Sequence, residues 1–502
     1  MSRLKKNILF NFAGQGIVIL LSLLSFKYIY KDLGQDALGI IYFTLMLGML
    51  LSSALDIGLT KTTTREVAAN FSDDLPYIIR LLQTFSLFYW LAYVIVLLAY
   101  LYLIPFILES WINLDSMSLE IAYSMLMVLG VSALLAIPRI FLVSILAGLQ
   151  RMDISNYVEI FITVIQQCGL IILLFGGADV MTIAYWIAMN NVIKMMAYMF
   201  YIAKLVNPSV LLPIFSFDVI GRIKSYASRM MWVSLLLVIH KQLDKVLISK
   251  FLPIGVMGIY SFTYSSISKT SLITSSVAQA VFPSFAELDK EDKRKESLDR
   301  YYTLQDFLVF GTLPIFIFVI YFSLPLFTFL LNVELAYELR TVVFLLCVCF
   351  YLNAVMRLVR TYLFAIGVTG PAIKADVISL LLVSPATVLL VYYFGLNGAA
   401  LSSVLYYVVM AGSIIPKVYN DVFEQSPHLW FRAIAYAIGI AILIYVPAGL
   451  ISYYYFESIL MHFVFFIIAS ILYGVVTVNI AGIGLKRAIV KHIPAASRLV
   501  RI

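Results

Sequence analysis

Long apolar runs, separated by charged residues or by Gly and Pro, follow one another along almost the whole chain. A membrane-spanning helix needs about 20 consecutive, mainly apolar residues. Runs of that kind predict fourteen spans, at 8–30, 37–59, 80–108, 118–147, 154–175, 180–205, 229–250, 255–282, 303–330, 341–366, 375–394, 398–416, 433–452 and 461–483. The longest polar stretches, 206–228 and 283–302, are too short for a soluble domain. The pattern therefore predicts an all-α polytopic membrane protein.

Composition agrees with a membrane protein. Hydrophobic residues make up 63% of the 502 and charged residues 12%, whereas soluble chains carry about 45–50% and about 25%. The net charge of +8 does not indicate nucleic-acid binding, because the basic residues lie at helix ends rather than in one basic domain. Cys168, Cys347 and Cys349 all lie in apolar runs, where we expect them to pack as small apolar side chains rather than form a disulfide or a metal site.

The positions of Lys and Arg predict the orientation of the chain. They concentrate in alternate loops and at both termini, while the opposite loops hold only Lys31, Lys250 and Arg340. Short basic loops stay in the cytoplasm. We therefore expect both termini in the cytoplasm, which agrees with an even number of spans.

The chain also contains an internal repeat. A shift of 219 residues superimposes Lys31–Leu33 on Lys250–Leu252, Gly39–Ile40 on Gly258–Ile259, Gly148 on Gly367, and Phe175–Gly176 on Phe394–Gly395. Six helices per half give both halves the same orientation, related by a pseudo-two-fold axis along the membrane normal. We predict two six-helix bundles, 1–206 and 207–416, with two extra helices and a tail in 417–502. Chance coincidence of Gly-containing turns is the alternative.

Enzyme motifs are missing from the sequence. It has no Walker loop, dinucleotide fingerprint, HExxH motif or His/Cys metal spacing. The predicted outer loops are too short for a catalytic domain. We expect a protein that is not an enzyme and that needs no cofactor or metal, and ATP-driven transport by this chain alone is not indicated.

Charges inside the predicted helices suggest what is transported. A charge near the bilayer centre costs about 2.5–3.5 kcal/mol, so it normally faces the bundle interior or a wet cavity. The candidates for a cavity are Arg139, Lys194, Lys241, Asp244, Lys245, Lys269, Arg357 and Arg360. The acids Asp56, Glu159, Asp306 and Asp376 lie nearer the cytoplasmic ends. A surplus of positive charge suits an anionic substrate such as a pyrophosphate or an acidic sugar.

Each candidate has a structural alternative. Lys241 and Asp244 are three residues apart, so they can neutralise each other on one helix face. Arg139 follows a proline and can cap the carbonyls that the proline frees. Arg357 and Arg360 share a helix face with no acid in their own helix, so either an acid on another helix or the substrate must compensate them. Lys194 and Lys269 are placed mid-helix without a local partner.

Several ordered motifs resemble a known family. They are Leu33–Tyr42, Leu55–Leu59, Thr64–Ala68, Leu146–Asp153, Gln242–Ile248, Val256–Tyr260 and Val281–Glu287. Together they resemble the polysaccharide (O-antigen unit) flippases of the multidrug/oligosaccharidyl-lipid/polysaccharide exporter superfamily, over roughly the first twelve predicted helices.

The resemblance implies a substrate and a setting. The substrate would be an undecaprenyl-pyrophosphate-linked oligosaccharide, moved from the cytoplasmic to the periplasmic face of a bacterial inner membrane for O-antigen or related surface polysaccharide. The polyprenyl tail would stay in lipid while the headgroup crosses by alternating access. Implied partners are this substrate, membrane lipids, a polysaccharide polymerase, a chain-length regulator and a coupling ion, H⁺ or Na⁺.

Three other functions compete with this one. A drug or metabolite antiporter of the same superfamily would be expected to have an acid-lined cavity and twelve helices. A membrane glycan polymerase or ligase would be expected to have a large outer loop. A flippase for the peptidoglycan precursor fits the same sequence features. The sequence does not choose between O-antigen, capsule and exopolysaccharide, nor does it name the sugar unit.

Overall fold

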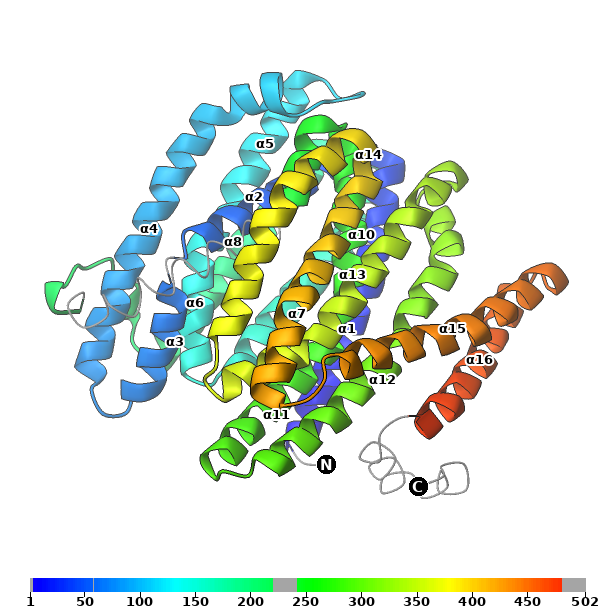
Figure 1. Ribbon diagram of the computed structural model, residues 1–502. Helices are drawn as coiled ribbons and strands as arrows, with labels where there is room; N and C mark the ends of the chain where they lie inside the picture. The colour runs from blue at the N-terminus through cyan, green and yellow to red at the C-terminus, as the bar shows by residue number, and fades with distance from the viewer. Residues whose placement is uncertain (1–2, 57, 220–241, 481–502) are drawn as a thin grey trace. The chain divides into compact units, whose positions relative to one another are not determined.

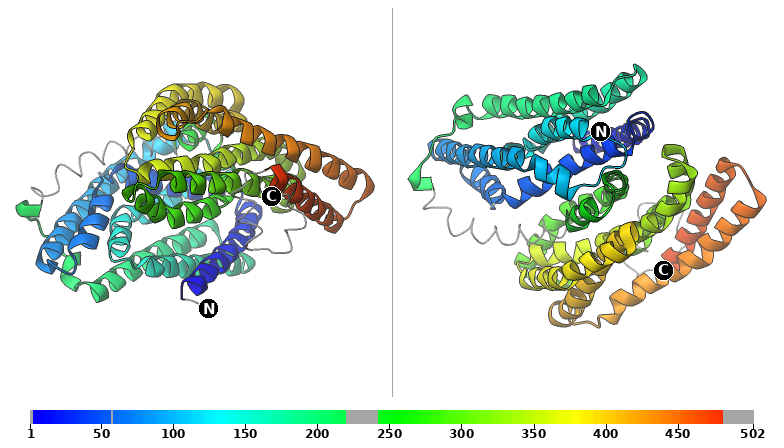
Figure 2. Two further views of the ribbon diagram at one scale, coloured as in Figure 1. Left: turned by 60° about the horizontal axis from the view of Figure 1, so that its bottom comes forward. Right: turned by 90° about the horizontal axis from the view of Figure 1, so that it is seen from above.

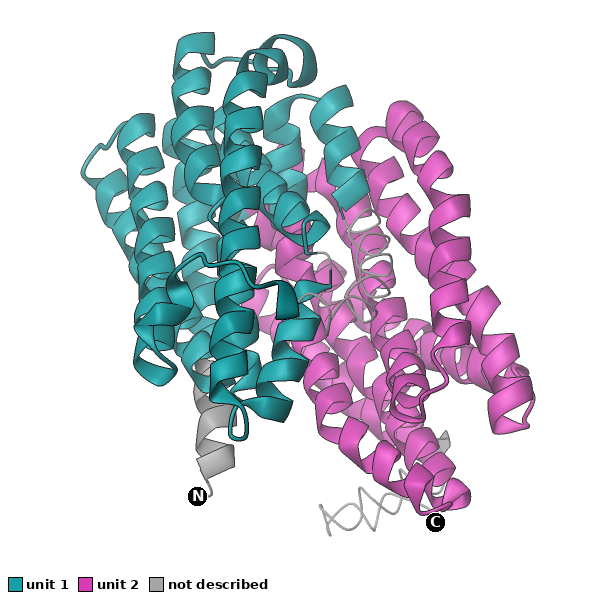
Figure 3. Cartoon of the chain, turned by 90° about the vertical axis from the view of Figure 1, so that its left-hand side faces the viewer, with its two compact units in different colours: residues 1–262, 329–331 teal, residues 263–328, 332–502 magenta. Residues whose placement is uncertain are grey.

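The computed structural model describes residues 3–56, 58–219 and 242–480, and within these ranges the chain is built of helices joined by short connections (Figure 1). The chain divides into two compact units, residues 1–262 with 329–331 (unit 1) and residues 263–328 with 332–502 (unit 2) (Figure 3). These units are compact bodies and not sequence repeats. The predicted division at 206/207 and 416/417 therefore stays a prediction.

The helices of unit 1 follow the predicted runs closely. They are α1 (Arg3–Tyr28), η1 (Ile29–Leu33), α2 (Gln35–Ala54), α3 (Leu59–Asn70), α4 (Leu75–Phe106), η2 (Ile107–Trp111), α5 (Leu119–Ala133), α6 (Ala136–Gly148), α7 (Met152–Phe175), α8 (Val180–Leu205) and η3 (Pro208–Leu211), followed by a helical segment at 242–251. In this unit α1 packs against α7, α7 against α8, α8 against α5 and α5 against α2.

The remaining helices lie largely in unit 2. They are α10 (Ile254–Ser268), which begins in unit 1, α11 (Ser271–Lys290), α12 (Arg294–Leu330), α13 (Val333–Ala365), α14 (Gly370–Val418), η4 (Tyr419–Phe423), α15 (His428–Tyr455) and α16 (Ile459–Ile480). α13 packs against both α11 and α14. α15 and α16 run side by side as a hairpin, which Figure 2 shows from two further directions.

The all-helical, multi-pass fold class is confirmed. Among the described residues, nine stretches are long and apolar enough to cross a membrane. One of them, 370–423, contains two predicted spans, because Gly395 departs from helical geometry (φ 54°, ψ −129°) and divides α14. α1, α8 and the pair α10–α11 correspond to three further predicted spans. The predicted span 229–250 lies mostly outside the described residues.

The predicted span 118–147 is two helices. α5 ends at Ala133 and α6 begins at Ala136, and Pro138 follows two residues later. A proline has no N–H to donate, and its ring clashes with the carbonyl four residues earlier. Leu134, which is that residue, therefore lies in the break. The structural alternative for Arg139, capping of the freed carbonyls, is not observed, because no side-chain hydrogen bond of Arg139 to a carbonyl is found among the described residues.

The predicted span 37–59 ends five residues early, and an unpredicted polar helix follows it. α2 stops at Ala54, and Gly58 adopts a positive φ of 71° at the start of α3. The carboxylate of Asp56 accepts hydrogen bonds from the backbone and hydroxyl of Thr60 and from the hydroxyl of Tyr89. Buried carboxylates need such donors, so Asp56 fixes the turn between the two helices.

The charged residues 287–296, within the polar stretch 283–302 between two predicted spans, are mostly helical. α11 continues to Lys290 and α12 begins at Arg294, so only a short turn separates them. Glu, Lys and Arg are good helix formers. Pairs such as Glu296 with Arg300, four residues apart, add a little stability to the exposed first turns of α12.

Two glycines equivalent in the repeat contact each other inside unit 1. A Cβ on Gly39 would lie 2.3 Å from the carbonyl oxygen of Ile254, and a Cβ on Gly258 would lie 2.8 Å from the Cα of Gly39. Only glycine permits the backbones of α2 and α10 to approach this closely. A contact between equivalent positions supports the internal duplication.

Candidate substrate-binding site

A buried lysine in unit 1 has an acidic partner that the sequence did not reveal. Lys194 in α8 places its Nζ 2.9 Å from Oε2 of Glu159 in α7. The hydroxyl of Tyr198, one turn further along α8, donates to the other carboxylate oxygen at 3.1 Å. Arg139 in α6 lies close enough to interact electrostatically with this group, although it makes no ion pair within 4.0 Å among the described residues. We call these four residues the Glu159 cluster.

Unit 2 contains a similar group, the Asp376 cluster. Arg360 in α13 holds Asp376 of α14 with two hydrogen bonds, Nη1 to Oδ1 at 3.1 Å and Nη2 to Oδ2 at 2.9 Å. The hydroxyl of Tyr406, beyond the α14 kink, donates to Oδ1 at 3.1 Å. Two parallel hydrogen bonds fix both the position and the orientation of the carboxylate. The acid that compensates Arg360 is therefore on another helix, one of the two possibilities left open by the sequence.

Arg357 completes the Asp376 cluster and differs from its neighbour. Its Nη2 donates to Oδ1 of Asn353 at 3.2 Å, and the amide of Asn353 donates in turn to the hydroxyl of Tyr407. Among the described residues, the buried Nε of Arg357 has no hydrogen-bond partner and the guanidinium makes no ion pair. The positive charge of Arg357 is thus held by a neutral amide and stays uncompensated.

The acids of both clusters lie at a similar distance from the start of their helices. Glu159 is seven residues from the start of α7 and Asp376 six from the start of α14, which is roughly 10 Å along each helix axis. Adding the repeat offset of 219 to Glu159 gives position 378, two residues from Asp376, and adding it to Arg139 gives 358, next to Arg357. Each half therefore brings together an acid, a tyrosine and two cations. The acid, the tyrosine and one cation, Arg139 or Arg357, are on corresponding helices, whereas Lys194 in α8 and Arg360 in α13 are not.

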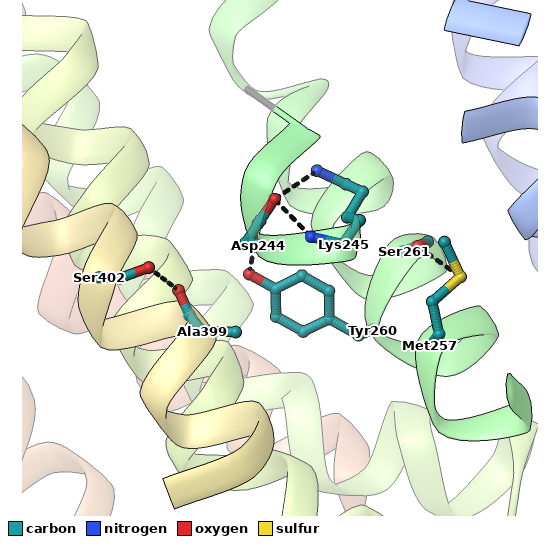
Figure 4. Close-up of polar contacts among 7 residues, drawn as sticks. All are labelled: Asp244, Lys245, Met257, Tyr260, Ser261, Ala399 and Ser402. Atoms are coloured by element: carbon teal, nitrogen blue, oxygen red, sulfur yellow. Dashed lines mark hydrogen bonds and ion pairs between the residues drawn. The ribbon is translucent and has the colours of Figure 1, made fainter. Parts of the chain in front are cut away.

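A third ionic group lies within unit 1. Oδ1 of Asp244 accepts from the backbone N–H of Lys245 and lies 3.3 Å from its Nζ, while Oδ2 accepts from the hydroxyl of Tyr260 at 2.8 Å (Figure 4). Both charged side chains are buried. The expected partner Lys241 lies outside the described residues. The observed pairing makes Asp244 and Lys245 electrically neutral as a pair.

Lys269 is not inside a helix as expected. It lies in the two-residue turn between α10 and α11, where it is half-buried and makes no ion pair among the described residues. Six of the eight candidates thus fall into three local groups, whereas Lys269 is separate and Lys241 lies outside the described residues. The tyrosines that hydrogen-bond to the acids were missed, because one tyrosine among the 33 of this chain carries no signal of its role.

The remaining candidate features are metal ligands and cysteines. No cluster of three His, Cys, Asp or Glu that could hold a metal occurs in the part of the chain that the structure describes. The three cysteines are free thiols, with Cys347 and Cys349 buried.

Comparisons with known proteins bear on the fold and the family. A model of the polysaccharide biosynthesis protein family matches residues 4–289, more than half of the chain. Among curated proteins, none matches this sequence.

Solved structures give similar folds at low sequence identity. The lipid II flippase MurJ in an inward closed conformation is 14% identical, with a TM-score of 0.68, over 93% of this chain and 98% of MurJ. An inward-facing multidrug resistance transporter of the MATE family, within the MOP superfamily, is 14% identical with a TM-score of 0.63, over 79% of this chain and 93% of that one. A MOP superfamily transporter from Pyrococcus furiosus, described as having a binding pocket of reverse polarity, is 13% identical with a TM-score of 0.54, over 82% and 93%.

Proposed function

This chain belongs to the polysaccharide biosynthesis protein family, and we propose that it is a flippase for an undecaprenyl-pyrophosphate-linked oligosaccharide. It would move this lipid from the cytoplasmic to the periplasmic face of a bacterial inner membrane, for O-antigen or a related surface polysaccharide. The fold shared with a lipid II flippase supports a lipid-linked substrate. The protein would act as a transporter and not as an enzyme.

Arg357 carries the proposal. It is a half-buried arginine in a membrane helix, held by a neutral amide and without an acidic partner among the described residues. An uncompensated charge of this kind is expensive inside a membrane. A transient anionic ligand would compensate it, and a guanidinium matches the oxygens of a pyrophosphate in pairs. Arg139 is the corresponding cation of the other half.

The remaining charges would shape the path of the headgroup. The paired acids Glu159 and Asp376 keep Lys194 and Arg360 in place, so that each cluster retains one net positive charge. As the polyprenyl tail remains in lipid, only the sugar and the pyrophosphate need a polar route, which alternating access would open to each side in turn.

Export of organic cations is the main alternative, and the acids argue against it. A cation exporter needs a carboxylate whose charge is not already compensated by a cation of the protein itself. Glu159, Asp244 and Asp376 are each bound to a lysine or an arginine. Asp56 is buried and hydrogen-bonded to Thr60 and Tyr89. The charges left over are therefore positive.

The test compares single arginines of α13 in cells that depend on this gene. We expect Arg357→Ala to reduce surface glycan on the order of tenfold or more, since a lost hydrogen bond to a charged group costs about 1.5–3 kcal/mol, while the amount of protein in the membrane stays normal. Arg357→Lys should be milder but not neutral, because the planar fork is lost. Surface glycan and membrane abundance are measured together.

A matched control comes from the same helix. Arg340 is exposed near the other end of α13, and Arg340→Ala removes the same charge without touching the Asp376 cluster. It should leave both glycan and abundance unchanged. Wild-type glycan in Arg357→Ala cells at normal abundance would remove this arginine from the transport mechanism.

A further inference from the structure

A cavity of about 450 Å³ opens within unit 1. Lys31 lies in a loop that the charge pattern predicts to face away from the cytoplasm. Its lining includes Lys27 from α1, Tyr30 and Lys31 from η1, Gln35 from α2, Ser116 from the loop before α5, and Leu330. None of the lining residues is acidic. The lining thus combines two cations and several polar groups with two leucines.

The two lysines are unusual for this side of the protein. Loops on the non-cytoplasmic side are normally poor in Lys and Arg, yet Lys27 and Lys31 lie four residues apart and line the same cavity. Like charges at that spacing destabilise a helix. Neither lysine forms an ion pair among the described residues, and the Nζ of Lys27 lies 3.3 Å from the ring centroid of Phe329. An anion in the cavity would relieve the repulsion.

The lysine equivalent to Lys31 in the other repeat is used differently. Lys250 donates from its Nζ to the backbone carbonyl of Ser110 and lies 5.6 Å from the ring centroid of Trp111. It is therefore tied to its surroundings by structural contacts. Lys31 is exposed and opens into the cavity instead. The difference between equivalent positions points to a ligand at Lys31.

The start of α2 forms part of the cavity wall. Gly34, with φ 85°, precedes the first turn of this helix, and the N-terminal N–H groups of a helix favour an anion. Asp36 in that turn is buried, and its Oδ2 accepts from three successive backbone N–H groups at 115–117. This carboxylate therefore fixes the loop that carries Ser116, and it does not line the cavity.

We propose that this cavity binds the phosphate headgroup of a membrane lipid. The ammonium groups of Lys27 and Lys31 hold the phosphate oxygens, and the lipid chain runs over Leu330 and Leu331. The Gln35 amide, which donates one N–H to Asp115, has a second N–H for the phosphate. Ser116 lines the cavity, but its hydroxyl and backbone N–H both donate to Asp36. Either an anionic phospholipid or a polyprenyl phosphate offers this chemistry. The inference does not depend on the proposed transport function, because none of these residues belongs to the Glu159 or Asp376 cluster.

Binding to the purified, delipidated protein tests the site. The probes are dioctanoyl phosphatidylglycerol, farnesyl pyrophosphate, inorganic pyrophosphate and, as a zwitterionic reference, dioctanoyl phosphatidylcholine. We expect the doubly substituted variant K27A/K31A to bind the anionic lipids roughly 30-fold more weakly than wild type. This estimate assigns to each lysine the binding free energy that is usual for one lysine near an anionic lipid surface. Its affinity for phosphatidylcholine should not change.

The arms separate the sources of the phosphate. Tighter lysine-dependent binding of farnesyl pyrophosphate supports a polyprenyl lipid, equal binding of phosphatidylglycerol supports bulk phospholipid, and binding of pyrophosphate alone supports a free phosphate. Arg340→Ala, which changes neither the cavity nor either charged cluster, should retain wild-type binding of every probe. Lipid binding by the Lys27 and Lys31 variants and surface glycan in Arg357→Ala cells are separate measurements, so failure of one proposal can be told from failure of the other. A K27Q/K31Q variant with wild-type thermal stability controls for folding. Wild-type affinity of both double variants for every anionic probe would overturn the proposal.

Discussion

The Glu159 cluster of unit 1 and the Asp376 cluster of unit 2 each contain an acid, a tyrosine and two cations but hold their acids differently. Arg360 grips Asp376 with two parallel hydrogen bonds, and the exposed fractions of their side chains are 23% and 10%. Lys194 makes one contact to Glu159, whose side chain is 46% exposed. One acid is thus fixed within the protein, and the other is accessible.

This difference distinguishes charged groups that stabilise the fold from charged groups that could contact a substrate. A bidentate pair between buried groups is rigid and costly to break. A single lysine contact to an accessible acid can rearrange. In the Asp376 cluster the cation without an acidic partner among the described residues is therefore Arg357. In the Glu159 cluster, Lys194 and Arg139 lie near a single acid.

Breaking the rigid pair should have the largest effect. Asp376→Ala leaves the partly buried Arg360 without its acid, and removing one partner of a buried ion pair costs about 3–5 kcal/mol. We expect a severe loss of protein from the membrane and a lower unfolding temperature in detergent. Membrane abundance and thermal unfolding of the purified protein measure this.

A double substitution tests whether the unpaired charge of Arg360 causes the loss of protein. Asp376→Ala combined with Arg360→Met removes both members of the pair and leaves an apolar side chain of similar length, so most of the abundance should return. If the double variant is as poorly expressed as the single one, the hydrogen bond from Tyr406 is the interaction that matters. Normal abundance of the single variant would contradict the structural assignment of the pair.

Much of the fold could be predicted from hydrophobic runs alone. Thirteen of the predicted spans have helical counterparts in the described residues, because apolar length is a strictly local property that a membrane enforces. Where the bounds of a predicted span were wrong, the cause is a local feature that the length of an apolar run does not show. Pro138 breaks the helix four residues earlier at Leu134, and the hydrogen bonds of Asp56 end α2 before its apolar run does.

The site could be predicted only in part. Intramembrane cations stand out by residue type, so Lys194, Arg357 and Arg360 are recognisable in the sequence. Their partners are not, because Glu159 and Asp376 lie on other helices, 35 and 16 residues away along the chain. The repeat offset contains a usable signal, since it brings Glu159 within two positions of Asp376. Matching acids across the two halves of the sequence is therefore a way to find both clusters.

A smaller effect is expected at the accessible acid, and its size sharpens the comparison. Glu159→Gln keeps an acceptor for Tyr198 but removes the charge that compensates Lys194. If water reaches the exposed side of Glu159, the substitution should lower the free energy of unfolding by about 1–2 kcal/mol. Thermal unfolding of Glu159→Gln and Asp376→Ala in detergent, measured side by side, shows which substitution destabilises the protein more. A loss as large as that of Asp376→Ala would mean that Glu159 faces lipid instead.

The smallest effect is expected from an ion pair outside the membrane, which sets the baseline for both clusters. Arg151 donates from Nε and Nη2 to the two carboxylate oxygens of Asp153 at 3.0 and 3.2 Å, but the side chains are 45% and 37% exposed. These hydrogen bonds lower the pKa of Asp153 below its ordinary value. Because the folded-state pKa is depressed, the pair contributes its stability above the unfolded pKa of about 3.9 and loses it as the pH falls through the folded pKa. Solvent screening reduces that contribution to well under about 1 kcal/mol.

We therefore expect Asp153→Asn to lower the unfolding temperature only slightly, by the same amount at every pH from 5 to 8, and less again below pH 4. Comparable losses for Asp153→Asn and Asp376→Ala would show that bidentate geometry, rather than burial, decides how much such a pair contributes.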